Sequence, residues 1–277
     1  MIQPLTTPMQ REIAQQTAIS NTLSQTQIQI STGKKIQQAS DDPAASARIA
    51  AIKLSETNNT SWASNISKGI SLNSQADSVM QTVSELMTQA KTLMVQASNG
   101  TQSAPDQSSV AAQLTSIASQ LDSLSKTSDA NGQPLFAQGA SLKVRYSESD
   151  VFAAVPSQSE AMAVAGTSLS AIVSSAATAV TSGNTAQISA ALTAVGNGLN
   201  NAADASAQIG LAANKLQTLQ NRQASDNLTM ENERSNLEDT DVSAAIAKLN
   251  QQSLTLQAAQ AAFARINRQT LFDILGP

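Results

Sequence analysis

The chain has 277 residues, no histidine, no cysteine and a formal net charge of −4 at pH 7. These absences exclude histidine-dependent nucleophilic catalysis, thiol chemistry and disulfides, and they remove the commonest metal ligand. The negative charge argues against a nucleic-acid partner, which requires a dense basic surface. No apolar run approaches the roughly 20 residues of a membrane-spanning helix, and no signal peptide is visible at the N-terminus.

The composition favours long helices over a compact core. Hydrophobic residues make up 41% of the chain, but aromatic residues only 2%. Aromatic side chains bury the largest areas, so a compact core of this size normally contains more of them. Charged residues make up only 13%, which leaves polar faces of Gln, Ser, Thr and Asn that suit self-association.

The first helical pattern runs from Met9 to Ile30. Its apolar stripe contains Met9, Ile13, Leu23 and Ile30. Gly33 suits the C-terminal cap of this helix, and Lys34 and Lys35 just beyond it can meet the negative end of the helix. The stripe has little to pack on within its own segment.

A second helix is predicted to begin in the sequence DDPAAS. Asp41 or Asp42 suits the N-cap, because Pro43 then occupies the first helical position. A seam at alternating steps of four and three follows, and such seams pair with other helices. It contains Trp62, Ile66, Gly69, Asn73, Ala76, Met80, Val83, Met87, Ala90, Met94 and Ala97. We expect Trp62 to be buried and the three methionines to provide adaptable packing.

The middle of the chain combines a third helix with a small insert. Apolar residues at helical spacing are Val110, Leu114, Ile117, Leu121 and Leu124, with Pro105 in the first turn and a stop at SDANG. The sequences LKVRY and DVFAAV predict a β-hairpin across a solvated turn with Glu148 and Asp150. A short helix is predicted between Ala161 and Gly183.

The C-terminal part carries the longest heptad pattern. Its seam contains Ile188, Leu192, Val195, Leu199, Ala202, Ser206, Ile209, Ala213, Leu216, Gln220, Gln223, Asn227, Met230, Arg234 and Leu237. Gly196 and Gly198 inside it predict a weak point or a close approach of another helix. Thr240 or Asp241 caps the last helix, whose apolar stripe contains Ile246, Leu249, Leu256 and Phe263.

Together these patterns predict a mainly α fold, an elongated helical bundle of long heptad-patterned helices with a small central insert containing a β-hairpin. The terminal helices are expected to form coiled coils on assembly. The expected segments are an N-terminal polymerisation helix, the N-terminal half of the bundle, an outward insert, a long C-terminal bundle helix and a C-terminal polymerisation helix. Their boundaries are 1–40, 41–137, 138–185, 186–240 and 241–277.

Paired carboxylates are the remaining route to an enzyme. They occur at Asp41–Asp42, Glu148–Asp150, Glu231–Glu233 and Glu238–Asp239–Asp241. Adjacent acids on a helix or turn rarely face one cleft, and the aromatic residues that line sugar sites are nearly absent. Capping and solvated turns explain them, so the sequence predicts no enzyme and no catalytic, cofactor-binding or metal-binding residues.

Several of these segments resemble the bacterial flagellin superfamily. The stretch STGKKIQQASDDPAASARIA after a leading helix, the turn DANGQPLFAQG and the ending NLEDTDVSAAIAKLNQQSLTLQAAQAAFARINRQTLFDIL are similar to the signatures of that family. The resemblance covers about 85% of the chain. It leaves two members open, the hook-associated protein of the hook–filament junction (hook-associated protein 3) and flagellin itself. The short insert with DVF and the ending LFDIL are more similar to the junction protein.

The resemblance implies a structural subunit of the extracellular flagellum, exported without a cleavable signal peptide by the flagellar type III apparatus with an export chaperone. It implies partners among copies of itself and other flagellar axial proteins, such as hook-associated proteins and flagellin. It also implies that terminal segments, here residues 1–40 and 241–277, are disordered in the free subunit and order on assembly. The stripe residues Met9, Ile13, Leu23, Ile30, Ile246, Leu249, Leu256 and Phe263 are the expected assembly interface. A flagellin-like surface protein that binds a polysaccharide stays open as an alternative.

Overall fold

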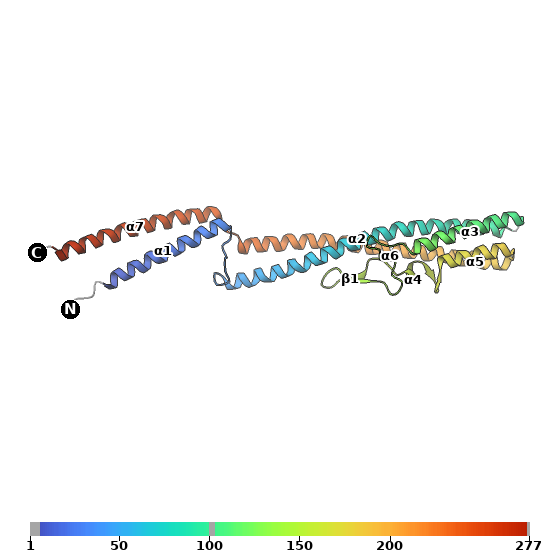
Figure 1. Ribbon diagram of the computed structural model, residues 1–277, viewed down its shortest axis with the longest axis horizontal. Helices are drawn as coiled ribbons and strands as arrows, with labels where there is room; N and C mark the ends of the chain where they lie inside the picture. The colour runs from blue at the N-terminus through green and yellow to red at the C-terminus, as the bar shows by residue number, and fades with distance from the viewer. Residues whose placement is uncertain (1–5, 100–102, 276–277) are drawn as a thin grey trace. The chain divides into compact units, whose positions relative to one another are not determined.

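The computed structural model describes residues 6–99 and 103–275, with side chains over 9–99 and 103–265. The fold is mainly α-helical, as predicted (Figure 1). The helices are α1 (Thr6–Thr32), α2 (Pro43–Ser98), α3 (Ala104–Ser125), α4 (Gln158–Ala161), α5 (Leu169–Ser182), α6 (Thr185–Glu238) and α7 (Val242–Leu275). The short strands are β1 (Lys143–Arg145), β2 (Val151–Ala153), β3 (Ala163–Val164) and β4 (Thr167–Ser168).

The chain divides into two compact units. The terminal unit comprises Met1–Glu56 and Asn227–Pro277, and the central unit comprises Thr57–Asp226. This division falls inside α2 and α6, whereas the predicted segments change at helix boundaries. Residues 1–5 and 276–277 of the predicted polymerisation helices, and residues 100–102 of the predicted loop after α2, lie outside the described residues.

The core of the central unit follows the two predicted heptad seams. On α2 the buried seam residues are Ile66, Gly69, Asn73, Ala76, Met80, Val83, Met87, Ala90, Met94 and Ala97, and on α6 they include Ile188, Val195, Ala202, Ile209 and Leu216. Met80, Met87 and Met94 have no exposed surface, which confirms their packing role. Trp62 is only half-buried, so its predicted burial is incomplete. Gln220 and Asn227 are exposed, and Leu219 is buried in place of Gln220.

Two shorter helices complete this core. The α3 helix begins with a capping box in which Ser103 and Asp106 each bond to the backbone of the other, and Pro105 lies in its first turn as predicted. The α5 helix ends at Gly183, whose φ of 68° forms a left-handed cap. The α3 and α5 helices contact each other closely. The predicted outward insert included α5, but an apolar face at helical spacing buries this helix in the core. Its buried residues are Leu169, Ile172, Val173, Ala176, Ala177, Ala179 and Val180.

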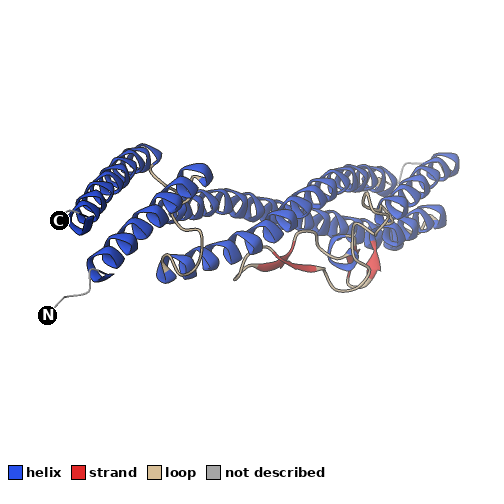
Figure 2. Ribbon diagram, turned by 60° about the vertical axis from the view of Figure 1, so that its left-hand side comes forward, coloured by secondary structure: helices blue, strands red, loops and turns tan. Residues whose placement is uncertain are grey.

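The insert contains two hairpins, of which the sequence predicted one. Strands β1 and β2 pair antiparallel, with Val144 opposite Phe152. Strands β3 and β4 form a second hairpin, whose turn holds Ala165 at φ 48° and Gly166 at φ 83° (Figure 2). The helix predicted from Ala161 therefore begins only at α5. Each strand of this hairpin has only two residues, which is too short for the alternation of apolar and polar residues that marks a strand in the sequence.

The first hairpin is tied to α6 by an aromatic and ionic cluster. The rings of Tyr146 and Phe152 lie 4.6 Å apart, and Lys215 Nζ lies 4.3 Å from the centre of the Phe152 ring. Lys215 Nζ also lies 3.1 Å from Asp150 Oδ1. The Ser147 hydroxyl and then Lys215 lower the pKa of Asp150. Asp150 is therefore a partner of the bundle rather than only a solvated turn residue.

A buried amide links three elements of the central unit. Asn73 Nδ2 on α2 donates hydrogen bonds to the carbonyl oxygens of Ala154 at 2.8 Å and Ile209 at 2.9 Å. Ala154 follows the first hairpin, and Ile209 lies on α6. Buried polar groups must be hydrogen-bonded, so Asn73 fixes these elements in one arrangement.

Candidate assembly interface

In the terminal unit, α1 packs against α7 along a heptad seam. The two helices lie side by side with their free ends at the same end of the pair (Figures 1 and 2). Apart from Gln29, the buried and half-buried residues of α1 are spaced by steps of four and three, and they are Glu12, Gln16, Ile19, Leu23, Thr26 and Ile30. Apart from Ser253, those of α7 follow the same steps and are Ala245, Leu249, Gln252, Leu256, Ala259 and Phe263. Such spacing is the signature of a coiled-coil contact.

Polar residues interrupt this seam. Thr26 is buried, and two acceptors lie within hydrogen-bond distance of its hydroxyl, the Thr22 carbonyl oxygen at 2.9 Å and Gln252 Oε1 at 3.0 Å. Gln16 Nε2 is buried and has no hydrogen-bond partner among the described atoms. Polar groups at seam positions specify register but reduce stability. The α1–α7 contact is therefore specific and weak compared with the methionine-rich core of the central unit.

The predicted interface residues divide into two groups. Leu23, Ile30, Leu249, Leu256 and Phe263 are half-buried on the α1–α7 seam. From the sequence, a terminal stripe has little to pack on within its own segment, but within the chain each terminal helix is the partner of the other and covers these five residues.

The other predicted stripe residues are exposed. Met9, Ile13 and Ile246 expose 41%, 50% and 45% of their surface. Sequence reasoning missed three further exposed residues of these helices, Ile28, Val242 and Leu254. Extending the four-and-three spacing backward from Phe263 selects Ala245 instead of Ile246 and would have assigned Ile246 to the outer face.

The connector from α1 to α2 contains the predicted caps. Gly33 follows the last residue of α1 with a φ of 70°, the left-handed conformation that glycine adopts without strain. Asp42 is the cap of α2, because its Oδ1 accepts a hydrogen bond from the Ala45 amide at 2.9 Å and Pro43 is the first helical residue. Asp41 instead holds the connector turn.

The role of Asp41 is visible in its hydrogen bonds. Its Oδ2 accepts the backbone amides of Gln37 and Gln38 at 2.9 and 3.0 Å, and these bonds lower the pKa of Asp41. Of the alternatives at the start of α7, Asp241 is the cap, since its Oδ1 accepts the Ala244 amide at 3.0 Å. The Thr240 hydroxyl is buried without a hydrogen-bond partner among the described atoms.

The sequence suggested that the side chains of Lys34 and Lys35 meet the C-terminal end of α1. In the structure they contact α6 instead. Lys34 Nζ forms an ion pair with Glu238, and Lys35 Nζ donates to the Asn236 carbonyl oxygen at 2.8 Å. Both contacts are made with the C-terminal turn of α6, where free carbonyl groups attract cations. Each lysine and its partner on α6 lie far apart in the sequence, so no local sequence pattern could have predicted these two contacts.

Several carboxylates of the terminal unit have structural partners. Arg48 Nη2 donates to Glu233 Oε2 at 2.8 Å, and this guanidinium lowers the pKa of Glu233. Arg234 Nε donates to Glu56 Oε1 at 3.1 Å, and Ser235 donates to Asp239. Among the described residues, no group of three or more acidic side chains could hold a metal ion.

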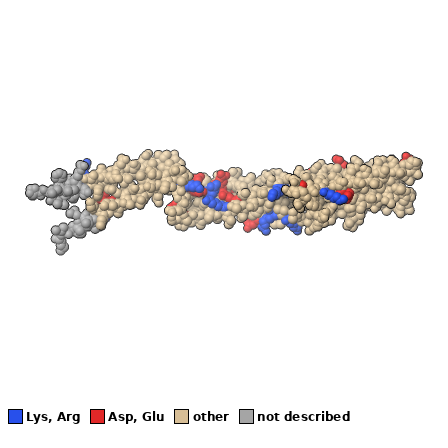
Figure 3. Space-filling model, in the orientation of Figure 1, with Lys and Arg blue, Asp and Glu red and all other residues tan. Residues whose placement is uncertain are grey.

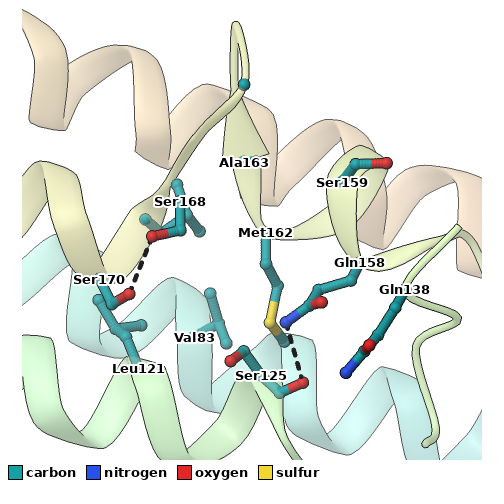
Figure 4. A pocket seen from close by; sticks show the side chains of 12 residues that line it. Val83, Leu121, Ser125, Gln138, Gln158, Ser159, Met162, Ala163, Ser168 and Ser170 are labelled. Carbon is teal, nitrogen blue, oxygen red and sulfur yellow. Dashed lines mark hydrogen bonds between the residues drawn. The ribbon is translucent and has the colours of Figure 1, made fainter.

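The central unit contains a small pocket of about 230 Å³ between α2, α3 and the second hairpin (Figure 4). Its lining has amide, hydroxyl and apolar side chains and no ionisable group. Gln158 Nε2 donates to the Ser125 carbonyl oxygen at 3.4 Å, and the hydroxyls of Ser168 and Ser170 lie 3.0 Å apart. A pocket without an acid, a base or an activated nucleophile offers no catalytic arrangement.

No helix in the described part of the chain is both long and apolar enough to span a membrane. Most of the face shown in Figure 3 is uncharged, and acidic and basic side chains lie next to each other over the C-terminal end of α6. Long heptad-patterned helices, paired terminal helices and exposed apolar side chains are typical of structural subunits that associate through helices.

Comparisons with known proteins agree with this class. Residues 6–141 match the family model for the bacterial flagellin N-terminal helical region. A similar solved structure is that of a candidate flagellar hook-associated protein from Vibrio parahaemolyticus, with a TM-score of 0.64 and 18% sequence identity. The match covers 72% of this chain and 100% of that chain, and at this identity it shows the fold. A comparison with curated protein sequences gives no match.

Residues 6–141 are thus similar to the flagellin family, in agreement with the N-terminal signatures of the sequence. The family match supports a structural subunit of the flagellum.

Proposed function

We propose that this chain assembles into a helical tubular array through α1 and α7, and that it lies at the junction between the hook and the filament. The observation that carries the proposal is the α1–α7 pair, which leaves apolar side chains of both helices exposed in a chain similar to the flagellin family. Exposed apolar groups on a paired helix surface favour association, because contact removes them from water. Head-to-tail contacts between identical subunits that do not close generate an open helical assembly.

Deletion of residues 1–40 and 241–277 tests the role of the terminal helices. The shortened chain is expected to lose assembly while keeping the helical circular dichroism of the remaining bundle. Normal copolymerisation of the shortened chain with the intact chain would show that the terminal helices are not the interface.

A matched pair of point variants gives a finer test. Leu254 on α7 and Leu211 on α6 expose nearly equal fractions, 69% and 70%. Leu254→Gln removes an apolar group from the proposed interface and should slow assembly, as measured by light scattering and electron microscopy. Leu211→Gln removes the same group from the central unit and should leave the rate unchanged. Equal effects of the two substitutions would argue against an interface confined to α1 and α7.

Electron microscopy of cells without this gene separates the junction protein from flagellin. Intact hooks with shed filaments would support a junction protein. Loss or shortening of a filament would instead support flagellin, which the family match to the flagellin N-terminal region favours as the second candidate. Either outcome keeps a structural role in the flagellum.

The remaining partners belong to the same proposal. We expect copies of this chain and other axial proteins as partners, export through the flagellar type III apparatus, and an export chaperone. A groove of about 630 Å³ along α2, whose lining mixes polar and apolar side chains and includes Lys68, Asp129 and Tyr146, is the place where a polysaccharide would bind. Binding of soluble glycans to the unassembled chain would support that alternative over a purely structural role.

A further inference from the structure

The first hairpin has an open strand edge that faces α2. The Tyr146 amide donates to the Asp150 carbonyl oxygen at 2.9 Å, and such ladder bonds alternate along an antiparallel pair. The backbone groups of Lys143 and Arg145 therefore point away from β2, toward the far edge of β1. On that edge, Asn65 Nδ2 of α2 donates to the Arg145 carbonyl oxygen at 2.9 Å. The amide and carbonyl groups of Lys143 have no partner among the described residues, so this part of the edge is free to pair.

The groove of about 630 Å³ along α2 lies beside this edge. Its lining contains α2 residues between Asn65 and Ser78, and it also contains Leu142, Val144 and Tyr146 from β1 and its flanks. At about 1.5 Å per residue, the helical side of the groove is about 20 Å long. An extended segment of about six residues has the same length, at about 3.3 Å per residue. The groove therefore has room along its length for a short β-strand.

The side chains of β1 differ between its two faces. Val144 and Tyr146 pack with Ile66 in an apolar cluster of the central unit. Side chains alternate between the faces of a strand, so Lys143 and Arg145 lie on the opposite face, where both are exposed. A strand added to this edge would meet apolar side chains on one face and basic side chains on the other.

The groove combines an uncovered apolar side chain with unpaired positive charge. Leu142 exposes 71% of its surface, and the exposed Lys68 of α2 also lines the groove. Lys68, Lys143 and Arg145 form no ion pair among the described residues. Basic side chains gather beside the first hairpin in Figure 3. Asp129 in the lining is occupied by two backbone amides of its own turn, each 2.8 Å from Oδ1.

We propose that this edge and groove bind an extended acidic segment of another protein, which adds to β1 as a third strand. Strand addition draws affinity from main-chain hydrogen bonds and specificity from alternate side chains. Acidic side chains of the added strand meet Lys143 and Arg145 on the exposed face. Apolar side chains of the added strand meet Leu142 and Val144 in the groove. Opposite charges and apolar pairs across neighbouring strands are stabilising, so the partner is an alternation of acidic and apolar residues.

Charge argues against the same edge of a second copy as the occupant. That edge brings its own Lys143 and Arg145, and like charges opposite each other are destabilising. Lysine on an edge strand commonly prevents such pairing between copies. A polysaccharide has no amide and carbonyl groups at strand spacing, so it leaves the Lys143 backbone without partners. The surface lies within the central unit, Thr57–Asp226, so it does not depend on the order of α1 and α7 or on the proposed array.

Fluorescence anisotropy on the full, unassembled chain tests this inference. The probe is a labelled peptide of about six alternating glutamate and valine residues, the length of the groove. We expect saturable binding that weakens as salt is added, because salt screens exposed charges. The analogue with lysine in place of glutamate should not bind, because it brings like charge to the basic face. Methylation of every second amide nitrogen, in the phase that faces β1, should abolish binding, since it removes the main-chain donors.

Two lysines of α2 provide a matched pair of variants. Lys68 and Lys91 are both exposed and form no ion pair among the described residues, but Lys68 lines the groove and Lys91 does not. Lys68→Glu and Lys143→Glu should each weaken binding of the glutamate peptide about fivefold, the upper range for an exposed ion pair. Lys91→Glu should leave binding unchanged. Leu142→Gln removes the apolar contact and should also weaken binding.

Absence of peptide binding would overturn the proposal, as would equal binding of the glutamate and lysine peptides or of the parent and methylated peptides. Polygalacturonate, an acidic polysaccharide, is the second probe. If it binds in a manner that Lys68→Glu weakens while the peptide does not bind, the groove belongs to a polysaccharide and the peptide inference is wrong. Each of these outcomes concerns the central unit alone, whereas assembly of the shortened chain bears on the proposed function alone.

Discussion

Two glycines two residues apart on α6 allow a sharp test of how closely this helix is approached. A methyl group added at Gly196 would meet no atom within 4 Å, whereas one added at Gly198 would lie 2.6 Å from Met87 Cε and 3.0 Å from Leu169 Cδ2. Met87 and Leu169 are buried, so neither side chain has free space into which it can move. Both glycines lie in the interior of the same helix, so they share the backbone cost of glycine.

The expected free energies of unfolding follow from two terms. Replacement of glycine by alanine inside a helix stabilises by about 1 kcal/mol. Gly196→Ala should therefore raise the melting temperature of the central unit by about 2–4 °C. At Gly198 the same gain is opposed by overpacking of about 1–3 kcal/mol, so Gly198→Ala should be neutral or destabilising by up to about 2 kcal/mol.

Urea unfolding followed by far-ultraviolet circular dichroism measures both variants against the parent chain. A double-mutant cycle with Met87→Leu isolates the contact, because leucine lacks the terminal methyl group that clashes. The double variant Gly198→Ala with Met87→Leu should be less destabilised than the sum of the single changes. Equal stabilisation by both alanines, or strict additivity in the cycle, would refute the close approach of α2 and α5 to α6.

Three further substitutions test single features of the fold. Asp42→Ala removes the cap of α2 and should cost about 1 kcal/mol in urea unfolding, with Asp42→Asn as the near-neutral control. Ala165→Gly relieves the positive φ of the second hairpin and should stabilise by about 1 kcal/mol, whereas Ala153→Gly in β2 should not stabilise. Asn73→Ala leaves two buried carbonyl groups without their side-chain donor and should cost about 2 kcal/mol in thermal unfolding. A stable Asn73→Ala chain would mean that Asn73 does not tie α2, the insert and α6 together.

Local periodicity predicted the helices that carry most of the fold. The methionines of α2 recur every seven residues, and a seam with that spacing is buried wherever a second helix covers it. Gly198 was ambiguous in the sequence, because a glycine in a helix marks either a weak point or a close approach. The positions of Met87 on α2 and Leu169 on α5 decide between these two readings of Gly198, and a sequence pattern within α6 does not contain them.

Contacts between distant segments are the part that the sequence could not show. Lys34 lies beside the end of α1 in sequence and suggested a partner there, but in space it meets Glu238 on α6. The exposed side of α7 was missed for a related reason, since an apolar residue such as Leu254 does not reveal whether it faces α1 or the outside. The face of α7 that becomes buried depends on where α1 packs against it, and the sequence of α7 alone does not show this.

The two units should also differ in how readily they open. Among the described residues, the terminal unit buries few apolar side chains, chiefly Ile49, Ile52 and Ala245, while the central unit has an extended core centred on its methionines. The free energy needed to open a helix rises with the number of buried contacts that opening breaks. The amide hydrogens of α1 and α7 should therefore exchange faster than those of residues 66–97 of α2.

Hydrogen exchange with mass spectrometry on the unassembled and assembled chain measures this difference directly. We expect the amides of α1 and α7 to be weakly protected before assembly and strongly protected afterwards, because the weak seam gains its stability only when Ile28, Ile246 and Leu254 are covered by neighbours. The amides of α2 should be strongly protected in both states. Strong protection of α1 and α7 in the unassembled chain would contradict this reasoning, since an already stable pair leaves no ordering step for assembly to drive.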